Sequence, residues 1–141
     1  MIPPLKIFLD ANILFSAAKT DGAVRSLLTA VLDAGHECWV DGYVLDEARR
    51  NVSAKAASAL PLLDELVLRL SVSTVAPGLQ AAESHGLPEK DRLVLAAAAA
   101  LGCDVLVTGD RTHFGKLYGR QAAGVLIHSP RSLYEQLFPP S

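Results

Sequence analysis

The hydrophobic and polar positions of this chain divide it into short apolar runs and longer segments with helical periodicity. Apolar runs of strand length lie at residues 5–9, 37–40, 72–76, 104–108 and 125–127. A helical segment follows the first run through Leu32, and another follows the second run through Asn51. This alternation is typical of a parallel sheet flanked by helices, so we expect an α/β fold.

The expected strands and helices differ in how deeply they are buried. Residues 7–9 and 105–107 are apolar at consecutive positions, as in central strands that are covered on both faces. Apolar residues at helical spacing between 60 and 70 predict a helical hairpin after the second strand, between residues 43 and 69. Pro88 then opens a helix whose alanine-rich part closes at Gly102 and is expected to be packed on several sides.

Composition narrows the class of protein. The chain has 141 residues, 50% of them hydrophobic, and its 13 basic and 15 acidic side chains give a net charge of −2. We therefore expect one domain at residues 1–141 with a buried core. The composition does not predict a disordered chain or a polybasic surface. The alanine-rich stretch at residues 93–103 is too short for a bilayer, which needs about 20 residues, so no membrane contact is expected.

The N-terminus and the cysteines favour a cytoplasmic protein. Residues 1–6 lack a charged leader, and Asp10 interrupts the apolar run that follows, so a secretion signal is not expected. Cys38 and Cys103 lie in apolar surroundings without the spacing of a metal site. Two buried, reduced cysteines are the simplest interpretation.

Acidic residues follow both expected central strands. Asp10 ends the first run, and Asp110 follows the strand at residues 105–107 after Thr108 and Gly109. Ligands of open parallel sheets bind beyond the carboxyl ends of the strands where the strand order reverses, so both carboxylates are candidate site residues. Each could equally be the N-cap of the next helix, and neither is decisive alone.

Two further carboxylates lie on expected helices. Glu47 borders the apolar stripe of the helix at residues 43–51, whereas Asp46 and Arg50 point away from it. Asp91 lies in the first turn of the alanine-rich helix, where a carboxylate complements the exposed N–H groups and the helix dipole. A solvated position for Glu47 and a purely structural role for Asp91 both stay open. The apolar residues that follow Asp91 nevertheless place it beside the expected crevice.

Four carboxylates that converge on one crevice imply a bound cation. Without one they would repel each other and raise each other's pKa values. Oxygen ligands with no supporting set of Cys or His residues suit Mg²⁺ or Mn²⁺ better than Zn²⁺. Because Mg²⁺ keeps several waters and engages phosphate oxygens, the pattern points to hydrolysis of phosphodiester bonds.

The order of these residues resembles that of the PIN domain family, and within it the VapC-like ribonuclease toxins of prokaryotic toxin–antitoxin pairs. Residues 8–14 resemble the first motif of the family, with Asp10 as metal ligand and Asn12 as polar helper. Residues 44–50 resemble the second motif, whose acid is Glu47.

The later motifs of that family follow in the same order. Residues 89–97 resemble the third motif, which makes Asp91 its acid, and residues 107–111 resemble the fourth, which makes Asp110 its acid and Thr108 its hydroxyl. Each motif is short, but four in sequence over nearly the whole chain are fairly specific.

The resemblance implies a fold and an activity. The fold is a three-layer α/β/α sandwich with a parallel sheet of four to five strands in the order 3-2-1-4-5 and a helical hairpin. The activity is Mg²⁺- or Mn²⁺-dependent endoribonucleolytic cleavage that leaves a 5′-phosphate. Asp10, Asp91 and Asp110 would hold the ion, and Glu47 would help to hold it or orient the attacking water.

One position departs from the resemblance. Many relatives carry another acid two or three residues after the acid of the fourth motif, where this chain has Thr112 and His113. This leaves open whether one or two metal ions bind. His113 could position a phosphate or carry a proton, or it could be an ordinary surface residue.

RNA binding would require a local basic rim, because the net charge is slightly negative. Arg111 and Lys116, in the loop after the fourth motif, are the best-placed candidates, with His113 beside them. Phe114 and Tyr118 could stack on bases or simply pack this loop. The other basic candidates are Arg49, Arg50, Lys55, Arg92 and Arg120.

The resemblance also implies protein partners. Relatives are held by an antitoxin that occupies a hydrophobic groove, which residues 24–28 and the helix at residues 60–70 could form here, unless their leucines belong to the core. Homodimers are also expected.

Two other classes of function stay open. The first is a PIN-like RNA- or protein-binding module with unused acids, which the missing acid near Thr112 favours and the ordered set of four carboxylates disfavours. The second is a phosphotransfer domain that uses Asp10, which is weaker because Asn12 stands where such phosphatases usually need a second Asp.

Overall fold

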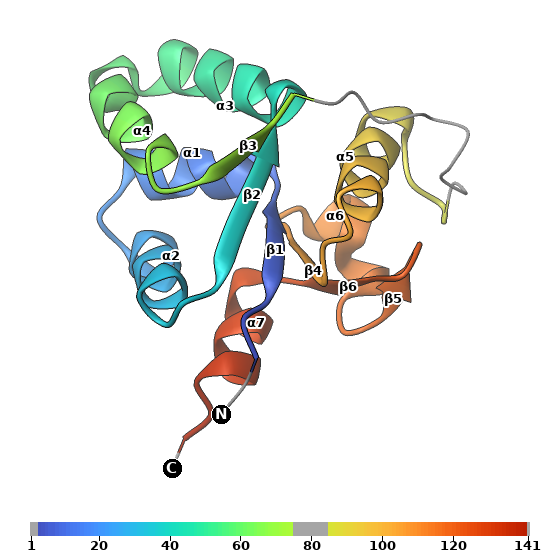
Figure 1. Cartoon of the computed structure of the whole chain (residues 1–141). Coiled ribbons are helices and arrows are strands. Elements are labelled where there is room, and N and C mark those ends of the chain that lie inside the picture. Colours follow the sequence, from blue (N-terminus) through green and yellow to red (C-terminus); the bar gives the residue numbers. More distant parts are fainter. Residues whose placement is uncertain (1–2, 75–84, 141) are drawn as a thin grey trace.

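A six-stranded sheet flanked by helices on both faces forms the centre of the fold (Figure 1). This computed structural model describes residues 3–74 and 85–140. The strands are β1 (Lys6–Leu9), β2 (Glu37–Asp41), β3 (Ser71–Ser73), β4 (Val105–Val107), β5 (Gln121–Ala122) and β6 (Val125–His128). The α/β fold class expected from the sequence is therefore confirmed.

Seven α-helices occur in the described residues, and Figure 1 shows α1 to α4 on one side of the sheet and α5 and α6 on the other. They are α1 (Ala11–Lys19), α2 (Ala23–Asp33), α3 (Gly42–Lys55), α4 (Leu60–Val67), α5 (Glu89–Ala100), α6 (Arg111–Phe114) and α7 (Pro130–Leu137). The same described residues contain two short 3-10 helices, η1 (Ala57–Ala59) and η3 (Gly115–Leu117).

The strand order extends the expected one at a single edge. The order is β3-β2-β1-β4-β6-β5, so the five strands up to β6 are parallel and arranged as expected, with β6 as the fifth expected strand. The short strand β5 was not expected and pairs antiparallel with β6. Ala123 and Gly124 join the two with φ values of 52° and 80°, as in a two-residue hairpin turn.

The first expected helix is in fact two helices. Instead of continuing through Leu32, the chain breaks after α1 at Thr20, which has extended backbone angles, and α2 begins after Gly22, which is also extended. The break lets both helices pack on the sheet side that α3 and α4 also cover.

The other expected elements are present with shifted ends. Strands β1 and β4 are buried along their apolar residues, which confirms that they are central. The expected helical hairpin consists of α3 and α4, and an ion pair of 2.6 Å between Arg49 and Asp64 joins them. The third strand is shorter than expected, and Val75 and Ala76 of that run lie outside the described residues.

Helix α5 and the cysteines also match the sequence expectations. Six residues of α5 are buried, and Gly102 follows the helix with a φ of 69°, a conformation that favours glycine. Cys38 and Cys103 are free and buried, and burial raises their pKa values to about 12 and about 11. Within residues 3–74 and 85–140, no helix is long and apolar enough to cross a membrane.

Candidate active site

The parallel pairing of β1 with β4 positions the centre of the candidate site. Leu9 is in register with Val107, and the backbone N–H of Asp10 donates to the carbonyl oxygen of Val107 at 3.0 Å. The residues that follow the two strands, Asp10 and Thr108, therefore emerge side by side at the carboxyl edge of the sheet.

Hydrogen bonds hold the Asp10 carboxylate in one orientation. Its Oδ1 accepts from the backbone N–H of Ala11 at 2.8 Å, and its Oδ2 accepts from Thr108 Oγ1 at 2.8 Å and from Asn12 Nδ2 at 3.3 Å. Asn12 Oδ1 in turn accepts from the backbone N–H of Gly109 at 2.8 Å. The side chain of Asn12 thus bridges the ends of both central strands.

Asp10 is held in a setting that disfavours its charge. Burial raises the pKa of Asp10 from 3.8 to about 6, and the hydrogen bonds from Thr108 and Ala11 offset part of that effect. The negative charges of Asp91 and Glu47 raise the pKa further. A cation in the crevice would reverse this effect, because opposite charge favours the ionised form.

A second group of side chains comes from α5 and α6. Nδ1 of His113 lies 2.7 Å from Asp91 Oδ2 and 2.8 Å from Asp110 Oδ2. Asp110 is also the N-cap of α6, because its Oδ1 accepts from the backbone N–H of His113 at 3.1 Å. The backbone N–H of Asp110 donates to Thr108 Oγ1 at 3.2 Å, which connects this group to Asp10.

The pKa of Asp91 is raised as well. Burial is the largest cause, and the charge of Asp110 adds to it. His113 and Lys90 act in the opposite direction. Asp91 is only 5% exposed, so its charge depends on these neighbours.

Glu47 reaches the site from α3. Its side chain is 11% exposed and forms an ion pair with Lys90, which lies at the start of α5. Asp46 and Arg50, the neighbours expected to point away, are exposed. The ion pair raises the pKa of Lys90, since its hydrogen bond with Glu47 favours the charged ammonium.

All four predicted carboxylates line one small pocket of about 130 Å³. The predicted helper Asn12 lines it too, and Thr108 lies directly behind it through its hydrogen bond to Asp10. The complete lining is Asp10, Ala11, Asn12, Glu47, Asn51, Lys90, Asp91 and Asp110. The structure thus brings together the acids that the sequence analysis selected, while their chemical roles remain a prediction.

Sequence reasoning missed Lys90 and Asn51 as members of this pocket. Asn51 follows Glu47 by four positions, so helical spacing could have found it. Lys90 precedes Asp91 directly, and nothing local shows that its side chain reaches Glu47 on another helix.

The donor set in the pocket fits a divalent cation. Carboxylate oxygens of Asp91 and Asp110 and a ring nitrogen of His113 lie within 4.8 Å of one another. Asp10 adds a buried carboxylate to the same pocket, and burial raises its pKa. Oxygen-rich sites of this kind match Mg²⁺ and Mn²⁺.

The loop after the fourth motif contains both exposed and packed side chains. Arg111 and Lys116, the best-placed RNA candidates, are exposed. Phe114 is fully buried, so it packs the loop and cannot stack on a base. The hydroxyl of Tyr118 donates to the carbonyl oxygen of Thr108 at 2.8 Å, which fixes that ring against the site.

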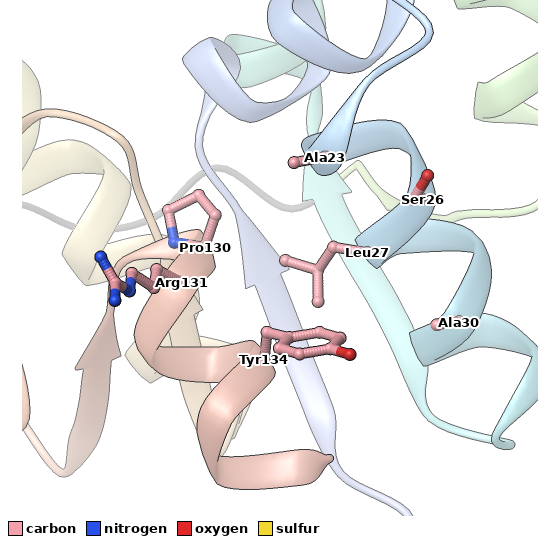
Figure 2. Close-up of a pocket in the computed structure, with 7 residues that line it drawn as sticks. All are labelled: Ala23, Ser26, Leu27, Ala30, Pro130, Arg131 and Tyr134. Carbon is pink, nitrogen blue, oxygen red and sulfur yellow. The ribbon is translucent and has the colours of Figure 1, made fainter. Parts of the chain in front are cut away.

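A separate apolar groove of about 650 Å³ lies between α2 and α7. Figure 2 shows Leu27 and Tyr134 pointing toward one another across it. The lining consists of Ala23, Ser26, Leu27, Ala30, Pro130, Arg131 and Tyr134. Residues 24–28 therefore contribute to a groove, as expected, but its other wall is α7 and not the helix at residues 60–70.

Comparisons with known proteins identify the same family as the motifs do. The family described as "PIN domain" matches residues 6–112. Among solved structures, the chain resembles VapBC2 from Rickettsia felis bound to a promoter DNA fragment, at a TM-score of 0.66 and 16% identity over 89% of this chain and 98% of that one. No curated protein matches the sequence.

Two further structures share the fold. DNA-bound VapBC from Salmonella typhimurium has a TM-score of 0.60 and 19% identity, and covers 89% of this chain and 98% of its own. FitAcB from Neisseria gonorrhoeae has a TM-score of 0.53 and 19% identity, with the same coverage of 89% and 98%.

Proposed function

Because this chain belongs to the PIN domain family, we propose that it is a Mg²⁺- or Mn²⁺-dependent endoribonuclease and the toxin of a type II toxin–antitoxin pair. The observation that carries this proposal is the convergence of Asp10, Glu47, Asp91 and Asp110 on one pocket. These acids come from four different parts of the chain. A merely structural role for each would not require them to share a pocket.

In this proposal Asp10, Asp91 and Asp110 hold the metal ion, and Glu47 helps to hold it or orients the attacking water. The ion, when bound, lowers the pKa of a water nucleophile and offsets the charge of the scissile phosphate. Asn12 and Thr108 act on Asp10: their hydrogen bonds orient its carboxylate, and the one from Thr108 offsets part of the rise in its pKa that burial causes. Preorganised ligands of this kind avoid the cost of reorienting side chains when substrate arrives.

The proposed substrate is RNA, bound along a basic rim. Arg111 and Lys116 are exposed and follow Asp110 in the chain. They are therefore placed to bind the RNA phosphates next to the scissile bond. Arg49 is less suited to this role, because its guanidinium already pairs with Asp64 at 2.6 Å.

The proposed protein partner is an antitoxin that docks in the groove between α2 and α7. Three of the structures that share this fold are VapBC structures, from Rickettsia felis, Salmonella typhimurium and Haemophilus influenzae. The groove is lined mainly by apolar carbon, and Tyr134 on its wall is 52% exposed. Burial of this apolar surface would favour the binding of an apolar segment of the antitoxin.

A homodimer is proposed for the free chain. Light scattering at micromolar concentration should then give about twice the mass of one chain, which is 14.9 kDa. A monomeric mass would exclude this part of the proposal.

The nuclease proposal is tested by cleavage of transfer, ribosomal and messenger RNA with Mn²⁺, with Mg²⁺ and with chelator. Asp110→Asn should abolish cleavage, whereas Asp46→Asn, which removes an exposed acid from α3, should not. Cleavage that survives chelator or the Asp110 variant would contradict the proposal.

The competing proposal, a PIN-like binding module, predicts a different pattern. Such a module would bind no Mn²⁺ in calorimetry and would lose no RNA or protein binding upon Asp110→Asn. The missing acid at Thr112 favours this alternative, and the shared pocket of four acids disfavours it.

A further inference from the structure

We propose that His113 is a nitrogen ligand of the metal ion and that this ligand makes the site prefer Mn²⁺ to Mg²⁺. The inference rests on the proposed metal-dependent function and deepens it. It starts from one atom: Nδ1 of His113 is shared between Asp91 Oδ2 at 2.7 Å and Asp110 Oδ2 at 2.8 Å.

The local structure holds the ring of His113 in this place. Asp110 caps α6 by accepting from the backbone N–H of His113, so the two residues are joined by backbone and by side chain. The next residue, Phe114, is fully buried and anchors the end of the helix. His113 therefore keeps its ring over the two acids although its side chain is 43% exposed.

Two of the separations between the three donor atoms match those of neighbouring ligands of one ion. Ligands at adjacent positions of an octahedral ion, each about 2.1 Å from it, are about 3 Å apart. The two distances from His113 Nδ1 are close to this separation, and all three donors lie within 4.8 Å of each other. A hydrogen on Nδ1 bridges these two oxygens when no ion is bound, and an ion in the place of that hydrogen would be held by all three atoms.

The chemistry of the nitrogen sets the preference. Mg²⁺ is a hard ion that takes oxygen ligands almost exclusively. Imidazole suits the first-row transition metals, and Mn²⁺ accepts both carboxylate and imidazole. A site of carboxylates alone would not discriminate between Mg²⁺ and Mn²⁺ through a nitrogen ligand. His113 is therefore the residue that determines the metal specificity of this site.

The direct test is electron spin echo spectroscopy of the Mn²⁺-loaded protein, together with calorimetric titration by Mn²⁺ and by Mg²⁺. The wild-type protein should show nuclear modulation from a directly bound ¹⁴N. The signal should vanish in His113→Ala and His113→Asp and persist in His85→Ala, which removes an exposed histidine. Because the wild-type spectrum is informative by itself, the test survives if a variant fails to fold.

The titrations give the second readout. His113→Ala should weaken Mn²⁺ binding about tenfold while changing Mg²⁺ binding less than about threefold. His113→Asp should tighten Mg²⁺ binding and remove the preference for Mn²⁺. Equal weakening for both ions, or bound Mn²⁺ without ¹⁴N modulation, would overturn the role of His113 and leave the nuclease proposal intact. A wild-type protein that binds no Mn²⁺ would overturn both.

Discussion

The hydroxyl of Thr108 donates a hydrogen bond of 2.8 Å to the carboxylate of Asp10, a residue 98 positions earlier in the chain. The same hydroxyl accepts from the backbone N–H of Asp110 at 3.2 Å. Thr108 is fully buried, so neither bond competes with water. One side chain therefore sets the relative position of two predicted metal ligands.

Replacing Thr108 by Val should lower the stability of the protein and shift the pH dependence of metal binding, because Val has nearly the same shape but no hydroxyl. The loss of buried hydrogen bonds should lower the free energy of unfolding by about 1–3 kcal/mol. The pKa of Asp10 should rise, because the Thr108 hydrogen bond lowers it in the native protein. The pH at which Mn²⁺ binding is half-maximal should then move upward, as calorimetry across pH would measure. Thr112→Val, at an exposed position, is the control, and equal behaviour of the two variants would contradict this account.

Asp10→Asn should stabilise the metal-free protein at neutral pH. The pKa of Asp10 is about 6 in the folded protein and 3.8 as a reference, so folding favours its protonated form. The stability that this proton contributes is present below about pH 4 and is lost as the pH rises through 6. With chelator at pH 7.5, the variant should gain about 1–3 kcal/mol in denaturant unfolding, and near pH 4 the gain should disappear.

Divalent metal should make the wild-type protein more stable than Asp10→Asn. Mn²⁺ should raise the unfolding midpoint of the wild-type protein more than that of Asp10→Asn, because binding to the native state adds stability. Asp46→Asn serves as the matched control at an exposed carboxylate. A variant that is destabilised equally at pH 4 and pH 7.5 would refute the assigned cause, burial of charge.

Lys90→Gln should tighten metal binding. The Lys90 ammonium pairs with Glu47 at the pocket wall, so it occupies a carboxylate and repels an incoming cation. Removing its charge should lower the dissociation constant for Mn²⁺ about threefold in calorimetry. Lys19→Gln, which removes the same charge from the exposed end of α1, should change it little. Weaker Mn²⁺ binding in Lys90→Gln would contradict this prediction and would mean that Lys90 favours metal binding.

Arg111→Gln combined with Lys116→Gln should weaken RNA binding and its dependence on salt. Each phosphate contact on a single strand contributes about 0.7 to the slope of log affinity against log salt, so losing two should reduce it by about 1.4. Fluorescence anisotropy with a single-stranded oligoribonucleotide, in an Asp110→Asn background that blocks cleavage, measures this. The control is the double variant Arg69→Gln and Arg131→Gln, whose side chains form ion pairs elsewhere. An unchanged slope would show that the rim does not bind phosphate.

Ala30→Glu should disrupt antitoxin binding without affecting cleavage. The new carboxylate would enter the apolar groove between α2 and α7, which shares no lining residue with the pocket of the four acids. The affinity for the product of a neighbouring antitoxin reading frame should fall more than about tenfold. Thr29→Glu, an exposed position on the same helix that does not line the groove, is the control. Equal effects of both variants would argue against this groove as the docking site.

Much of the site could be predicted from sequence because its local requirements are visible there. Asp10 and Asp110 were open to two interpretations, N-cap or site residue, and the structure gives each a capping hydrogen bond and a place in the pocket. The two roles agree, since a carboxylate that caps a helix directly after a parallel strand already lies at the carboxyl edge of the sheet.

The errors of prediction have local causes. The break between α1 and α2 falls at residues 20–22, where apolar spacing continues on both sides, although Asp21 and Gly22 form a dipeptide typical of turns. Strand β5 has two residues, too few for a recognisable pattern, and its turn uses Ala123, which rarely takes a positive φ. Phe114 could be assigned to the core only once the packing of its loop was known.

The sequence by itself determined the α/β class, the central strands and the four candidate acids, because periodicity and capping depend on neighbouring residues. Tertiary structure alone decided that Lys90 pairs with Glu47, that His113 Nδ1 lies between Asp91 and Asp110, and that α7 faces α2 across the groove. These relationships join segments far apart in the chain, and their distances follow from strand register and helix packing, which no local pattern encodes.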